Sequence, residues 1–341
     1  MFLMRKAPIL RSASAVAALA LAGASVTACS SGEQDSASTS ATGPNGDTTV
    51  LATTSVWADV ASAVTGSEVE AIIAGADIDP HHFEPSAKDL ARVREADTLV
   101  ANGGPYDASL YTVTEQDRII SAIPLVNKEE AEAHAHEHDH AHDDGENHAH
   151  SHDSLPGDPD DLEHAWFSTE KVKQVASALK EKAGGSTEDV DTRMDAVNQK
   201  LAELPHTHVA MTEPIAAPLV WGTELHDITP EGYMRSALNE ADPSVQDVAT
   251  FLDEIKAGHV DILIANPQST NSATEQLTNA ARENNVAIVE MRETPPEGVN
   301  FLDYFDQVVD QLVDAVNSLP HDSNDDTHDH GDPHSDEEHA A

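Results

Sequence analysis

The sequence predicts an α/β protein of two lobes, each built on a parallel sheet, with a helix joining them. Short apolar runs alternate with amphipathic stretches early in the chain, and the same alternation starts again near His208. Once the low-complexity segments are set aside, roughly 250 residues remain, which is enough for two lobes of ordinary domain size.

The first lobe is predicted from a strand–helix–strand–helix–strand order. Because parallel strands need a crossover connection, and a helix separates each strand from the next, this order predicts a parallel sheet. The expected strands cover residues 49–56, 69–73 and 98–101, and the expected helices cover residues 57–64 and 86–96.

Two further helices are expected over residues 169–182 and 187–204, with Gly184 and Gly185 between them and Pro205 after the second. The alternation then restarts and predicts the second lobe. Its expected strands cover residues 208–211, 260–265 and 286–290, and its expected helices cover residues 216–221, 245–256, 272–284 and 301–319. Ser272 to Glu275 has the form of a capping box that opens the third of these helices.

The N-terminus has the features of an export signal. Arg5 and Lys6 precede an Ala- and Leu-rich apolar run, too short for a good membrane span, that ends at Cys29, the chain's single cysteine. Val26 stands three residues before Cys29 with small residues between them. This arrangement resembles a lipobox, in which the cysteine is diacylated and becomes the mature N-terminus. We therefore expect a lipid-anchored protein on the extracytoplasmic face of the cell membrane, without a disulfide in the monomer.

These patterns predict the organisation of the whole chain. The expected segments are a signal peptide at 1–28, a lipidated flexible leash at 29–47, an N-terminal lobe at 48–185 with a disordered His-rich insert at 130–158, a linker helix at 186–205, a C-terminal lobe at 206–320 and a disordered His- and Asp-rich tail at 321–341. The formal net charge of −44 indicates that nucleic acids and anionic lipid surfaces are repelled, so no nucleic-acid partner is expected.

The insert contains a tract of histidines that alternate with acidic and small residues. Neutral imidazole is a strong ligand for zinc and other late first-row divalent ions. The tract histidines are His134, His136, His138, His140, His142, His148, His150 and His152. Their i, i+2 spacing does not place them on one helical face, so they cannot form the specific site. Two interpretations remain open: weak gathering of metal, or a solvated low-complexity loop.

A more specific motif follows the second predicted strand. It reads Asp79-Pro80-His81-His82-Phe83-Glu84-Pro85, at the end of the strand where open α/β sheets bind ligands. Together with the segment from Ala96 to Gly103, it resembles the metal-binding receptors of zinc and manganese ABC importers, and the resemblance extends from about Thr49 to Leu319. The resemblance implies two Rossmann-like lobes with parallel sheets, joined by a long rigid linker helix, with a metal site in the inter-lobe cleft.

The resemblance also implies four metal ligands. His81 matches the first ligand, and His164 matches the second, although Leu-Glu precedes it where the family pattern has Asp-Pro. Glu213 matches the third ligand and Glu293 the fourth.

Other residues near these matches are interpreted without a metal role. His82 falls at a variable position of the motif, and Trp166 is expected to pack so that it orients the loop of His164. His206 and His208 look like a chelating pair, but we interpret them as residues on the approach to a strand.

Two imidazoles and two carboxylates can hold zinc tetrahedrally or manganese at higher coordination. The affinity order of such sites favours zinc, and the long His-rich insert resembles that of zinc-type members. The prediction is therefore a monomeric, non-enzymatic receptor that binds Zn²⁺ and delivers it to an ABC permease and its ATPase subunit. Mn²⁺ is the alternative cargo.

Two other classes of function were weighed. A zinc hydrolase needs an open metal position that activates water, but the sequence has neither an HExxH motif nor a nucleophile elbow. A surface adhesin is the other alternative, because some members of the resembling family are adhesins and the insert and acidic tail could bind partners.

Overall fold

The computed structural model describes residues 41–42, 48–75, 83–129, 162–220, 222–239 and 241–320. All of them belong to one compact unit, Ser40–Ala341. Several sequence predictions lie outside the described residues: the signal peptide, Cys29, most of the leash, His81, the His-rich tract and the tail.

The first lobe is built on a sheet of four parallel strands. They are β2 (Thr49–Thr54), β3 (Glu70–Ile73), β4 (Thr98–Ala101) and β5 (Ile119–Ser121). Their order across the sheet is β3-β2-β4-β5, and a short strand, β1 (Ala41–Thr42), pairs antiparallel with the start of β2. The predicted parallel sheet is confirmed. The sequence did not predict β5, because three residues are too few to show a periodicity.

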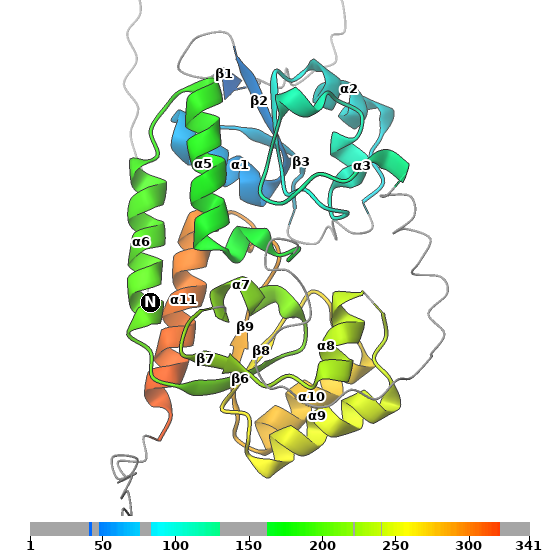
Figure 1. The fold of residues 1–341 in the computed structure, drawn as a ribbon, viewed down its shortest axis with the longest axis vertical. Coiled ribbons are helices and arrows are strands. Elements are labelled where there is room, and N and C mark those ends of the chain that lie inside the picture. The colour runs from blue at the N-terminus through cyan, green and yellow to red at the C-terminus, as the bar shows by residue number, and fades with distance from the viewer. Residues whose placement is uncertain are drawn as a thin grey trace, which may run out of the picture. The chain divides into compact units, whose positions relative to one another are not determined.

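The second lobe repeats this order. Its strands are β6 (Thr207–Met211), β7 (Leu225–Asp227), β8 (Ile262–Ala265) and β9 (Ala287–Glu290). All neighbours pair in parallel in the order β7-β6-β8-β9 (Figure 1). In both lobes the second parallel strand in chain order therefore lies at one edge of the sheet, next to the first strand. The third and fourth strands follow on the opposite side of the first strand. The sequence did not predict β7, whose Leu-His-Asp composition is short and polar.

Helices cover the faces of the two sheets. They are α1 (Ser55–Thr65), α2 (Ala87–Glu95), α3 (Ala108–Tyr111), α5 (Thr169–Ala183), α6 (Glu188–Ala202), α7 (Ala217–Val220), α8 (Glu231–Leu238), α9 (Val245–Ala257), α10 (Ser272–Glu283) and α11 (Phe301–Ser318). Short 3₁₀ helices are η2 (Gln116–Arg118), η4 (Ala165–Phe167) and η5 (Pro214–Ala216). The sequence did not predict α3 or α8.

Two local predictions are wrong in detail. The capping box of α10 is formed one residue earlier than expected, because the Asn271 side chain accepts from the Thr274 backbone N–H and the Thr274 hydroxyl accepts from the Asn271 backbone N–H. Ser272 is instead the first helical residue. The first strand ends at Thr54 rather than Val56, since α1 begins at Ser55 and buries Val56 and Trp57 as helical residues.

The α6 and α11 helices pack against each other. The α6 helix lies between the two sheets in sequence and packs against α5 and α11, which run beside it in Figure 1. Arg193 of α6 forms ion pairs with Asp303 and Asp306 of α11 at 2.8 and 3.0 Å. The α11 helix also contacts the first lobe, where the Asp59 carboxylate accepts from the Phe301 backbone N–H at 2.6 Å. The helix that the sequence predicts as a linker is therefore flanked by the last helix of the chain.

The largest core cluster draws residues from both lobes, including Trp57, Phe167 and Phe305. The Phe167 and Phe305 rings meet edge to face with their centroids 5.4 Å apart, a favourable aromatic geometry. No helix in the described part of the chain has the length and apolar character needed to cross a membrane.

Candidate metal centre

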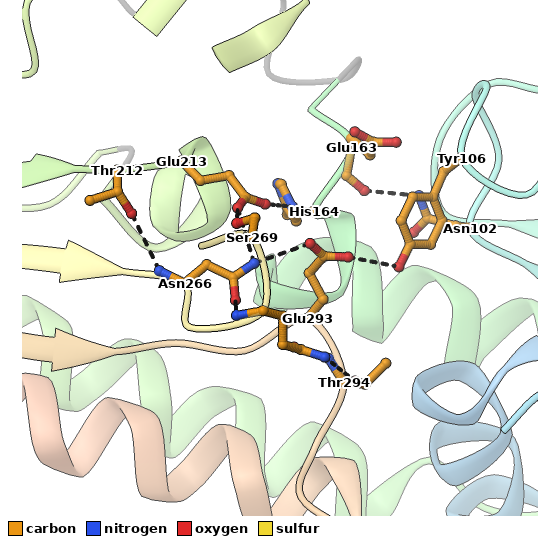
Figure 2. A network of polar contacts seen from close by, with 11 residues as sticks. Asn102, Tyr106, Glu163, His164, Thr212, Glu213, Asn266, Ser269, Glu293 and Thr294 are labelled. Carbon is orange, nitrogen blue, oxygen red and sulfur yellow. Dashed lines mark hydrogen bonds and ion pairs between the residues drawn. The ribbon is translucent and has the colours of Figure 1, made fainter. Parts of the chain in front are cut away.

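Three side chains from distant parts of the sequence meet between the lobes. His164, Glu213 and Glu293 each offer one ligand atom, and these atoms lie within 4.8 Å of one another (Figure 2). The sequence predicted all three as metal ligands. The fourth predicted ligand, His81, lies outside the described residues.

Glu213 is positioned by the end of β6 and by the turn after it. Its backbone is extended, and Pro214 opens η5 directly behind it. The carboxylate oxygen Oε2 accepts from Asn266 Nδ2 at 3.0 Å and from the Ser269 hydroxyl. One carboxylate oxygen is thus held by the protein, and the other faces His164.

Glu293 follows β9 and is buried, with 7% of its surface exposed. Its Oε1 atom accepts from Asn266 Nδ2 at 3.1 Å, and its Oε2 atom lies 3.5 Å from the Tyr106 hydroxyl of the first lobe. The next residue, Thr294, forms two hydrogen bonds with the side chain of Gln268, so the loops after β8 and β9 hold each other in place.

His164 immediately precedes η4 and is buried, with 4% of its surface exposed. The ring of Trp166 meets the imidazole edge to face at 5.2 Å, as the sequence predicted for a residue that orients this loop. The buried His164 Nε2 atom lies 3.0 Å from Glu213 Oε1 and forms an ion pair with it when the imidazole is protonated.

The charges of the site are coupled. Burial alone lowers the pKa of His164, but the carboxylates of Glu213, Glu293 and Glu163 outweigh it and leave this pKa above its usual value. Burial likewise raises the pKa of Glu213, but the contact with His164 and the donors Ser269 and Asn266 outweigh it and leave this pKa lowered. Without metal, His164 and Glu213 each favour the charged form of the other. A bound cation must replace the proton of the charged imidazole.

The residues that hold the candidate ligands in place were not predicted from the sequence. Asn266 follows β8 directly, and its single amide nitrogen contacts both Glu213 and Glu293. In the first lobe, Asn102 follows β4 directly, donates from Nδ2 to the Glu163 backbone carbonyl at 2.8 Å and accepts from Trp57 Nε1 at 3.2 Å. A polar residue directly after a buried strand, at the carboxyl end of a parallel sheet, is the signal that could have identified both.

The arrangement suits a divalent cation. Two carboxylates and one imidazole converge on one point, and hydrogen-bond donors hold Glu213 Oε2 and both oxygens of Glu293. Such outer donors are the usual support of a metal site. Oxygen and nitrogen ligands of this kind serve zinc and manganese alike.

A protein-family model covers most of the chain. Residues 50–315 match the family model described as zinc-uptake complex component A, periplasmic. No curated protein matches the chain by sequence.

Solved structures share the fold. The zinc-bound ZnuA-like domain of AdcA from Streptococcus pneumoniae is 16% identical with a TM-score of 0.51, over 79% of this chain and 98% of that one. FpvC from Pseudomonas aeruginosa in complex with Mn²⁺ is 18% identical with a TM-score of 0.52, over 79% and 97%. The laminin-binding protein Lmb of Streptococcus agalactiae, described as having adhesin and metal-transporting activity, is 14% identical with a TM-score of 0.55, over 78% and 98%.

Proposed function

The chain belongs to the family of periplasmic zinc-uptake component A proteins, and from that premise we propose that it is a high-affinity zinc receptor. The family consists of extracytoplasmic metal-binding receptors of ABC importers, not of enzymes. The observation that carries the proposal is the convergence of one imidazole and two carboxylates, from His164, Glu213 and Glu293, whose ligand atoms lie within 4.8 Å of one another.

The proposed ligands are His81, His164, Glu213 and Glu293. His164 and His81 would supply imidazole nitrogens from the first lobe, and the two glutamates would supply carboxylate oxygens from the second. A cation held this way joins the lobes, so that a permease can distinguish the loaded receptor from the empty one.

Zinc is the proposed cargo for a chemical reason. A pair of imidazoles favours zinc over manganese, whereas carboxylates discriminate little between them. Similarity of fold does not choose the metal, because the neighbours include zinc, manganese and nickel complexes.

The proposed setting follows from the sequence. Cys29 is the proposed site of lipidation, which would tether a monomeric receptor to the outer face of the cytoplasmic membrane. Its partners would be an ABC permease with its ATPase subunit.

A competition titration tests the function. The purified chain is titrated with equimolar Zn²⁺ and Mn²⁺ in the presence of a strong chelator, so that only the tightest site is detected. We expect one tight equivalent filled by zinc, lost in His164→Ala and retained in His259→Ala, which removes an exposed histidine of the second lobe.

Two outcomes contradict the proposal. Displacement of zinc by manganese at equal concentrations makes the chain a manganese receptor with the same site. Retention of the tight equivalent in His164→Ala places the metal elsewhere.

A further inference from the structure

A second group of histidines lies on the sheet of the second lobe. His206 stands just before β6, His208 lies in β6, and His226 lies in β7. Side chains two apart on an extended chain share one face, which places His206 with His208. The parallel register pairs His208 with His226 directly, so all three imidazoles share that face.

The spacing of the first two rings matches a shared metal ion. The Nε2 atoms of His206 and His208 lie 3.4 Å apart. Two imidazole nitrogens bound to one tetrahedral zinc at about 2.0–2.1 Å are separated by about 3.3–3.4 Å. The ring centroids lie 5.1 Å apart, and rings that share one zinc have centroids roughly 5 Å apart by the same geometry.

The third ring completes the group. The centroid of His226 lies 5.8 Å from that of His206 and 5.8 Å from that of His208. A side-chain rotation of His226 that moves its ring less than about 1 Å closer to the other two brings the ring centroids to the distance expected for imidazoles that share one zinc ion. We propose that His206, His208 and His226 form a second, open zinc site with three imidazole ligands and a water molecule in the fourth position.

This site is separate from the candidate metal centre between the lobes. Glu213 comes five residues after His208, along β6 and the extended chain that continues it. Five extended residues span roughly 16 Å at about 3.3 Å per residue. The histidines therefore lie toward the amino ends of the strands, whereas the inter-lobe site lies at the carboxyl ends. The Asp261 carboxylate accepts from the His208 backbone N–H at 2.8 Å and fixes this end of β6.

The surroundings suit an exchangeable cation. His206 is exposed, and His208 and His226 are half-buried, so a bound ion stays in contact with water. Three nitrogen ligands favour late first-row divalent ions such as Zn²⁺, Ni²⁺ and Cu²⁺ over Mn²⁺. The strongly negative chain raises the local concentration of cations.

Residue-specific carbethoxylation tests the site in the full purified chain. Diethylpyrocarbonate modifies free imidazole, and peptide mass spectrometry reports each histidine separately, so the His-rich tracts do not interfere. We expect ZnCl₂ to protect His206, His208 and His226 with one common midpoint, while His259 reacts equally at all zinc concentrations.

Variants show whether the three residues act together. His226→Ala should raise the zinc midpoint of His206 and His208 at least about tenfold, because one of three protein ligands is lost. The matched control His259→Ala should leave the midpoint unchanged, and so should Glu213→Gln, which disables only the inter-lobe site. Circular dichroism checks the fold of the variant, and His226→Gln replaces it if the alanine variant unfolds.

Two results overturn the proposal. Zinc-independent modification of His206 and His208 shows that no metal binds there. An unchanged midpoint in both His226 variants shows that His226 is not a ligand.

Discussion

The two lobes carry an asparagine at the same place and use it differently. Asn102 follows the third strand of the first parallel sheet, and Asn266 follows the third strand of the second. In the first lobe the amide binds the backbone of Glu163, next to the ligand histidine. In the second lobe the amide lies between the side chains of Glu213 and Glu293.

The difference follows from the charge of the ligands in each lobe. A single imidazole needs only a fixed loop, which a hydrogen bond to the backbone provides. Two carboxylates repel each other, and a shared N–H donor between them reduces that repulsion in the metal-free state. The same scaffold thus positions an imidazole in one lobe and two carboxylates in the other.

A second pair of equivalent positions lies five residues further on. Asp107 precedes α3, and Asn271 precedes α10. Asp107 is fully buried and accepts from the Thr53 hydroxyl and from the backbone N–H groups of Asn102 and Gly103. Burial outweighs these donors and raises the pKa of Asp107 to about 6. Asn271 cannot titrate, so only the first lobe has a pH-sensitive group here.

The largest expected effect tests whether the carboxylates of the second lobe bind the metal. Glu213→Gln removes one anionic ligand, and we expect zinc affinity to fall about 100-fold or more, beyond the loss typical of an outer partner. Glu213 helps to hold the pKa of His164 above its usual value. In the variant, protons should therefore compete with zinc for His164 only at lower pH, and the acid-dependent loss of zinc affinity should begin at a lower pH. Calorimetric titration at several pH values measures both effects.

Glu231→Gln is the matched control, since Glu231 is an exposed glutamate of the same lobe paired with Arg235. If Glu213→Gln binds zinc as tightly as this control, the second lobe does not supply that ligand.

The next prediction sets the two asparagines against each other. Asn266→Ala should weaken zinc binding about 10–100-fold, because both carboxylates lose an orienting donor. Asn102→Ala should instead lower the free energy of unfolding by about 1–3 kcal/mol, because the buried Trp57 and Glu163 groups lose their partner. Zinc titration and urea unfolding of the metal-free chain separate the two. Equal effects of both variants in both measurements would show that the asparagines have the same role.

The smallest effect concerns pH and stability. The pKa of Asp107 is raised in the folded state, so its contribution to stability is present below pH about 4 and is lost as the pH rises through about 6, by about 1–3 kcal/mol. Asp107→Asn should remove this decline, at the cost of one buried hydrogen bond. Urea unfolding between pH 4 and 7 measures the slope.

The reverse exchange in the second lobe adds a carboxylate whose contribution to stability should change with pH in the opposite direction to that of Asp107. Asn271→Asp places a carboxylate at the N-terminus of α10, where the charged form is favoured and the pKa is lowered. Its contribution, about 0.5–1 kcal/mol, should be present above pH about 4 and lost as the pH falls. A stability of Asn271→Asp that falls relative to the parent chain as the pH rises from about 4 to about 7 would contradict the assigned environment of this position.

The sequence alone determined the two-lobe α/β class, most strands and helices, and the residues that could bind metal. These inferences depend on local periodicity, which reports the buried face of each element, and on the motif around His81. They were least accurate where an element is short, as at β5 and β7, because three residues show no period.

Only the tertiary structure decided which distant groups meet. The contact of Asn266 with two carboxylates depends on how the loops after β6, β8 and β9 lie beside one another. From the sequence, His206 and His208 were interpreted without a metal role. His226 lies in a different segment of the chain, so no local pattern groups it with them. That residue joins them because the parallel register of β6 and β7 places it opposite His208. Strand register is set by pairing between segments far apart in the chain, so periodicity within one segment does not reveal it.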